Sequence, residues 1–133
     1  LQYAGAVPIG GQHVSNDIAR GLTTSFAAAE RIKTLYGSAM ASSSDDHEWI
    51  DVPPLGEEQS QSTPNHVPRS LLVGIIQPRL EETLEMIRTE INECGLGHLI
   101  GWRLAITGGA GINAAYFEQT SSYRAAYSCG RIG

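Results

Sequence analysis

The chain has 133 residues, 41% of them hydrophobic, which is enough for one domain and not comfortably for two. Its formal net charge of −5 and its nine dispersed Lys and Arg residues argue against a protein that neutralises phosphates, so no nucleic-acid partner is expected. No apolar run approaches the roughly 20 residues of a membrane-spanning helix, and two cysteines without metal-ligand spacing favour a reducing cytosol.

The chain opens at Leu1 rather than Met, and residues 3–9 read as the end of a strand whose sheet partners lie elsewhere. We therefore expect a fragment of a larger protein. Gly10 and Gly11 then lead into a helix over residues 12–20. Paired glycines leave room for a ligand beside the backbone, and the N–H groups of a helix start favour an anion. The alternative is an ordinary tight turn.

Two short helices follow the glycine turn. The first carries an apolar stripe, and Gly21 is placed as its stop: Val14, Ile18 and Leu22. The second runs through Tyr36 and is closed by Gly37, with three candidate N-caps: Thr23, Thr24 and Ser25. Its expected buried arc is Ala28, Ala29, Ile32, Leu35 and Tyr36.

Glu30 and Lys33 stand three residues apart on the second helix, about 60° from each other at 100° per residue. One interpretation is a surface pair that only solvates the helix and contributes a few tenths of a kcal/mol, about what exposed pairs give. The other is a ligand pair, in which the carboxylate accepts from ribose hydroxyls and the ammonium donates to the sugar or lies along the base. The spacing leaves both open.

The next segment changes character. Residues 39–41 and 48–52 are strand-like and predict a hairpin, and residues 56–65 are too polar to bury and predict a mobile connection. The acidic run at residues 45–48 between the two strands is interpreted as a solvated loop rather than a metal site, because its residues are consecutive and no other ligand supports them.

A long amphipathic helix is predicted over residues 68–94, with Pro78 marking a kink or a first turn. Its apolar positions recur at spacings of four, three and four: Leu80, Leu84, Ile87 and Ile91. A strand over residues 102–106 then enters a second glycine turn at Gly108 and Gly109, after which residues 112–116 can begin a helix. The order of elements indicates an α/β fold, in which two glycine turns can face one crevice at a sheet edge.

Other chemistry finds little support. The histidines at positions 13, 66 and 98 have no Ser or Cys context typical of a nucleophile, so acyl transfer is not indicated. Asp17 lies close to the glycine turn and is interpreted as a surface or capping residue, with ordering of water or Mg²⁺ near a phosphate as the alternative.

Four separated segments, in order, closely resemble the bacterial cell-division family FtsA, an actin-like family: VPIGGQHVSNDIARGL, AERIKTLYGSAMASSSDD, NHVPRSLLVGIIQPRLEETLEMIR and LAITGGA. The resemblance covers about residues 3–110. It implies an actin-like (RNase H-like) ATPase fold, of which this chain holds part of the second lobe. Residues 1–10 would end a strand of subdomain 2A, residues 11–100 would form subdomain 2B, and residues 101–133 would return to subdomain 2A.

The resemblance also implies a nucleotide site for ATP and Mg²⁺ in the full-length protein. Its nucleotide-binding residues in this chain would be Gly10, Gly11, Glu30, Lys33, Gly108, Gly109 and Ala110. The family's upstream phosphate loops are not in this sequence, so this chain alone is not expected to hydrolyse ATP, and no catalytic residue is assigned. After Ala110 the sequence departs from the family pattern until residues 130–133.

Partners follow from the same resemblance. The family polymerises, binds the C-terminal peptide of the tubulin-like FtsZ, and reaches the inner face of the cytoplasmic membrane at the septum through a C-terminal amphipathic helix that this sequence does not show. Arg69 and Arg79 are candidate contacts for the acidic peptide, because guanidinium groups hold carboxylates. The apolar groove beside them would come from Leu71, Leu72 and Ile75. Ordinary surface arginines are the alternative.

Two other functions stay open. The chain could be a piece of another actin-like ATPase, a chaperone or an MreB-like rod-shape protein, although these need a substrate domain or a different insertion. It could also be a truncated product that folds poorly without its sheet partners.

Overall fold

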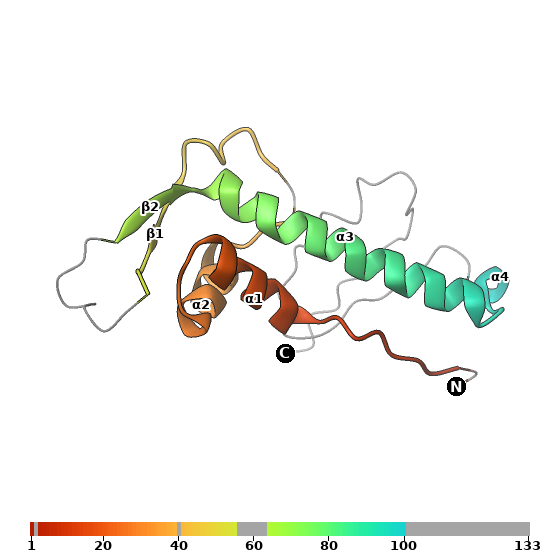
Figure 1. The fold of residues 1–133 in the computed structure, drawn as a ribbon. Helices are drawn as coiled ribbons and strands as arrows, with labels where there is room; N and C mark the ends of the chain where they lie inside the picture. The colour runs from red at the N-terminus through yellow and green to blue at the C-terminus, as the bar shows by residue number, and fades with distance from the viewer. Residues whose placement is uncertain (2, 40, 56–63, 101–133) are drawn as a thin grey trace.

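The computed structural model describes residues 1, 3–39, 41–55 and 64–100. Its elements in chain order are α1 (Gly11–Gly21), α2 (Phe26–Tyr36), β1 (Trp49–Val52), β2 (Asn65–Pro68), α3 (Arg69–Glu93) and α4 (Gly97–Ile100). In Figure 1, α1 and α2 lie on one side of the long α3, and the two strands continue from the start of α3. The residues expected to form the strand at 102–106, the second glycine turn and the returning subdomain lie outside the described residues.

Helix α1 forms as its apolar stripe predicts. Val14, Ile18 and Leu22 are all buried, because residues four apart share one helix face. Gly21 is the last helical residue, as predicted, and the residue with left-handed backbone is Thr23, two positions later, with a φ of 51°. A Cβ at Gly21 would lie 2.6 Å from Cδ1 of Ile75, so the glycine allows α1 to approach α3 closely.

Helix α2 begins and ends where its capping residues predict. The Ser25 side chain accepts a hydrogen bond from the Ala28 N–H group, and Gly37 follows the last turn. Three positions of the expected arc are buried: Ala28, Ala29 and Ile32. Leu35 and Tyr36 are exposed, which corrects the predicted arc.

The hairpin pairs different segments from those predicted. β1 runs antiparallel to β2, with Trp49 opposite Pro68 and Val52 opposite Asn65, so the expected pairing of residues 39–41 with 48–52 is wrong. Asn65 falls at the end of the predicted mobile connection and Pro68 at the start of the predicted long helix, whereas both belong to β2. The available signal was Pro68, which biases the residue before it toward extended backbone.

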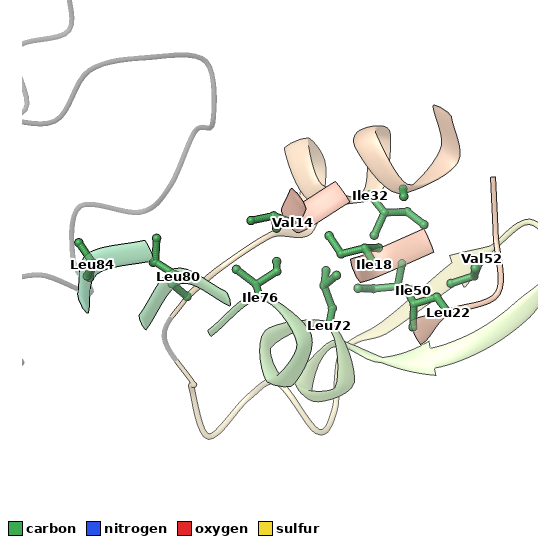
Figure 2. Packing of buried hydrophobic residues seen from close by; sticks show 12 residues of the cluster. Val14, Ile18, Leu22, Ile32, Ile50, Val52, Leu72, Ile76, Leu80 and Leu84 are labelled. Atoms are coloured by element: carbon green, nitrogen blue, oxygen red, sulfur yellow. The ribbon is translucent and has the colours of Figure 1, made fainter. Parts of the chain in front are cut away.

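Helix α3 supplies one wall of the core. Its buried side chains are Leu72, Val73, Ile76, Leu80 and Leu84, while Ile87 and Ile91 of the predicted stripe are half-buried. Pro78 lies inside the helix and not in its first turn. Figure 2 shows Leu72 close to Ile18 and Ile50, so the helices and the hairpin share one apolar cluster. Burying such a leucine contributes about 2 kcal/mol.

Two further observations complete the architecture. The extended segment before α1 runs beside the C-terminal half of α3, where the Tyr3 hydroxyl donates a hydrogen bond to the Glu90 carboxylate (Figure 1). Among the described residues, no helix combines the length and the hydrophobicity needed to cross a bilayer.

Candidate functional site

A polar cluster lies where α2 faces the first turn of α1; we call its four residues, Gly11, Ser15, Glu30 and Lys33, the Lys33 cluster. The Lys33 ammonium donates to Oε1 of Glu30 at 2.9 Å, to Oγ of Ser15 at 2.8 Å and to the Gly11 carbonyl at 3.2 Å. The Ser15 hydroxyl lies 2.8 Å from the same Oε1 and donates to it. The structure thus joins the Glu30–Lys33 pair to the residues of the glycine turn.

The two charged side chains of the Lys33 cluster differ in exposure. The Lys33 side chain is 10% exposed and uses all three ammonium hydrogens within the cluster, whereas the Glu30 side chain is 38% exposed. Hydrogen bonds from Lys33, and then from Ser15, lower the pKa of the Glu30 carboxyl against the opposing effect of burial. Glu30 is therefore ionised at neutral pH. Within the described part of the chain, its Oε2 has no hydrogen-bond partner.

The glycine turn itself is open on one side. A Cβ built on Gly10 would meet no atom within 4 Å. Its N–H group donates to Nδ1 of His13 at 3.1 Å, so a histidine that the sequence left without a role caps the turn. The signal was its position, because a side chain at the third helical residue can reach back to the residue before the helix. Gly108, Gly109 and Ala110 lie outside the described residues.

Arg69 occupies a second polar cluster, at the start of α3; we call Asp45, Glu48 and Arg69 the Arg69 cluster. The guanidinium donates to Asp45 at 3.3 Å, to Glu48 at 3.2 Å and to the Tyr36 carbonyl at 3.0 Å. Asp45 is almost fully buried, and its other oxygen accepts from the Ser42 N–H group at 2.7 Å. The interpretation of this acidic run as a solvated loop is therefore wrong for Asp45, because an arginine distant in the sequence covers it.

Arg79 is held in the same manner by α1. Its guanidinium makes two hydrogen bonds to the Asp17 carboxylate, at 2.6 and 3.0 Å, and a third to Glu82 at 3.1 Å. The bond to Asp17 raises the pKa of Arg79, so the arginine stays charged. Both Asp17 oxygens are engaged by this arginine and face α3.

The three residues expected to line an apolar groove beside the arginines do not share one surface. Leu72 is fully buried in the core and cannot line a surface groove. Ile75 is half-buried against the core cluster, and Leu71 is exposed. Leucines at adjacent helical positions point about 100° apart, so they could not both face the same groove.

Among the described residues, no group of three or more His, Cys, Asp or Glu side chains is placed to hold a metal ion. Asp17, for which ordering of water or Mg²⁺ is the alternative interpretation, is bound to Arg79.

Two paired strands and the helices that pack against them make a small α/β unit, in which Gly11 of the Lys33 cluster directly follows the open Gly10. The chain belongs to the FtsA family of cell division proteins: the family model described as "Cell division protein FtsA" matches residues 1–125. Membership implies an actin-like fold, and the α/β unit is consistent with part of one.

Several relatives carry the same name, "Cell division protein FtsA". The protein of Rhizobium meliloti (strain 1021) is 47% identical over 110 residues, covering 83% of this chain and 25% of that protein. The Bacillus subtilis (strain 168) protein is 33% identical over 103 residues, covering 77% and 22%. The Escherichia coli (strain K12) protein is 30% identical over 117 residues, covering 83% and 27%. The chain thus spans about a quarter of the length of these relatives.

Proposed function

We propose that this chain is part of an actin-like polymer subunit that binds ATP between two lobes and links the FtsZ ring to the cytoplasmic membrane. In this proposal residues 1–10 end a strand of subdomain 2A, residues 11–100 form subdomain 2B, and residues 101–133 return to subdomain 2A. The protein would act at the inner face of the membrane at the division septum. Attachment there would use a C-terminal amphipathic helix.

The observation that carries the nucleotide part of the proposal is the Lys33 cluster. It brings Glu30 and Lys33 of α2 against Gly11 at the start of α1, although these residues are about 20 positions apart in the sequence. The cluster keeps Glu30 ionised and leaves one of its oxygens unpaired within the described chain. An unpaired carboxylate oxygen accepts hydrogen bonds, which suits the hydroxyls of a ribose better than a phosphate.

The proposed contacts with the nucleotide come from Glu30 and from the two glycine turns. Glu30 would accept from the ribose, and Gly10 would let the ligand approach the backbone, because the space above it is open. Gly108, Gly109 and Ala110 would close the adenosine side. Mg²⁺ would enter with the phosphates, on ligands contributed by other parts of the full-length protein.

Binding of ATP to the full-length protein, titrated in the presence of Mg²⁺, tests this proposal. Glu30→Gln keeps the size of the side chain but removes its charge, and we expect the Kd for ATP to rise by about tenfold to a hundredfold. Glu93→Gln, an exposed change at the far end of α3, is the matched control and should leave the Kd unchanged. If folded full-length protein shows no saturable ATP binding, the nucleotide proposal fails.

A second variant tests the glycine turn. Gly10→Ala should leave folding intact, since the φ of −149° suits any residue and nothing crowds its Cβ. It should weaken ATP binding if the ligand uses the open space, because the methyl group would occupy part of it. Undiminished affinity would exclude a close approach of the ligand to this glycine.

The proposed partner on the α3 side is the FtsZ C-terminal peptide, and Arg69 and Arg79 are the candidate contacts. The protein is also proposed to associate with itself into filaments. Each arginine already binds carboxylates of its own chain, so a peptide would have to compete with Asp45 or Asp17. A peptide titration with matched variants tests this. Asp17→Asn should strengthen binding if Arg79 holds the peptide, whereas Arg79→Gln should weaken it; equal affinities would remove Arg79 from the interface.

A further inference from the structure

Ser15 is a fully buried polar residue whose hydroxyl does more than a helical serine ordinarily does. Such a serine usually bonds only to the carbonyl four residues earlier, which here is Gly11 at 3.2 Å. The Ser15 oxygen is also 2.8 Å from Oε1 of Glu30 and 2.8 Å from the Lys33 ammonium. A buried hydroxyl between two opposite charges on another helix is therefore engaged on every side.

The chemistry of the groups limits how the hydrogen bonds are arranged. An ammonium only donates, so Ser15 accepts from Lys33. The single hydrogen of Ser15 then has two acceptors, the Gly11 carbonyl at 3.2 Å and the Glu30 carboxylate at 2.8 Å, and the shorter bond to the charged carboxylate is the stronger one. The two remaining ammonium hydrogens of Lys33 are donated to the Gly11 carbonyl and the Glu30 carboxylate. Lys33 has no donor left for a ligand unless it gives up one of these bonds.

The arrangement leaves Glu30 as the charged side chain of the cluster that can receive a new partner. Its Oε1 accepts from both Ser15 and Lys33, while Oε2 has no partner within residues 1–100 as far as these are described. A free glutamate side chain samples several rotamers, and fixing it costs about 1 kcal/mol or more of conformational entropy. With Ser15 in place, part of this ordering precedes ligand binding.

We infer that Ser15 is a positioning residue: its hydroxyl anchors one oxygen of Glu30 so that the other is held in place for a ribose hydroxyl, which makes Ser15 a determinant of ribose selectivity. This inference rests on the proposed contact between Glu30 and the nucleotide. It gives Lys33 a supporting role, holding α2 to the first turn of α1, and not a direct contact with the nucleoside.

The test compares ATP with 2′-deoxy-ATP and 3′-deoxy-ATP, titrated into the full-length protein with Mg²⁺. Ser15→Ala should raise the Kd for ATP about fivefold, the size of one ordinary hydrogen bond. It should leave the Kd of the analogue that lacks the contacted hydroxyl almost unchanged, so selectivity falls by the same factor. Merely loosened packing would raise all three Kd values together and leave selectivity intact.

Three variants complete the experiment. Ser15→Cys retains nearly the same volume but only weak hydrogen bonding, and should lose selectivity as Ser15→Ala does. Thr24→Val removes another buried hydroxyl bond, to the Pro53 carbonyl, and should keep selectivity. In the Glu30→Gln background, Ser15→Ala should change selectivity no further, since the residue acts through Glu30.

The outcomes distinguish failure of the Ser15 inference from failure of the proposed ATP binding. If the unaltered protein does not bind ATP, the proposed function fails and the inference with it. If it binds ATP and discriminates against a deoxy analogue, but folded Ser15→Ala and Ser15→Cys discriminate equally well, only the inference is overturned. Failure of both Ser15 variants to fold, with Thr24→Val folded, would make Ser15 a purely structural residue and also overturn it.

Discussion

The Lys33 cluster and the Arg69 cluster use similar chemistry with opposite burial. In the Lys33 cluster the cation is the nearly buried member, and its glutamate remains 38% exposed with one oxygen unpaired in the described chain. In the Arg69 cluster one of the two anions is the buried member: Asp45 is 3% exposed, and both of its oxygens accept hydrogen bonds, while Glu48 is 53% exposed.

The difference lies in which carboxylate keeps an oxygen without a partner in the described chain. Burying Asp45 and satisfying both its oxygens ties the loop before β1 to the start of α3 and leaves no acceptor on this carboxylate. Burying the cation instead holds a carboxylate at the surface, already ionised and partly oriented. We therefore expect changes to the Arg69 cluster to affect stability and changes to the Lys33 cluster to affect binding.

The largest expected effect comes from the core on which both clusters depend. Leu72→Ala removes a fully buried side chain and should destabilise this region by about 2 to 5 kcal/mol. Hydrogen exchange followed by mass spectrometry should show lost protection in α1 and α3 together. Leu71→Ala, at the adjacent exposed position, is the control and should change protection little. If α1 stays protected in Leu72→Ala, the two clusters do not share one core.

The next prediction compares one variant from each of the two clusters. Asp45→Ala leaves Arg69 short of a partner and the Ser42 N–H group unsatisfied, so it should cost about 2 kcal/mol, seen as faster exchange in residues 41–48. The Kd for ATP should not change. Glu30→Gln should show the opposite behaviour, with a small loss of stability and a large loss of affinity. If Asp45→Ala and Glu30→Gln lost similar amounts of stability, the expected difference between the two clusters would be contradicted.

The smallest effect is a pH dependence that belongs to Glu30. Because its folded pKa is lowered from an ordinary value of 4.5, the stabilisation is complete above that value and is lost as the pH falls through the folded pKa. The contribution of Glu30 to the free energy of unfolding should stay below about 1 kcal/mol, since water screens a side chain that is more than a third exposed. The thermal midpoint of the unaltered protein should exceed that of Glu30→Gln at pH 7, and the gap should narrow toward pH 3. A gap that widens on acidification would reverse the sign of the effect.

Local signals in the sequence predicted the helices well. Ser25 and Gly37 mark the ends of α2, and the stripe of Val14, Ile18 and Leu22 marks the buried face of α1, because capping and helical periodicity depend on near neighbours only. The strand at residues 65–68 was missed because its pairing with β1 is a contact across a long connection. The burial of Asp45 was missed for the same reason, since Arg69 lies 24 positions away.

The sequence by itself determined that two capped helices would follow a glycine turn, that Glu30 and Lys33 would share a helix face, and that the chain resembles one family of cell division proteins. Only the tertiary structure decided which hydrogen bonds that face makes. When α1 packs against α2, Ser15 comes between the two charges. The Lys33 ammonium then donates all its hydrogens within the chain, whereas Glu30 retains one carboxylate oxygen without a partner in the described residues. Spacing along one helix could not reveal this, because the partner that orients the pair comes from another helix.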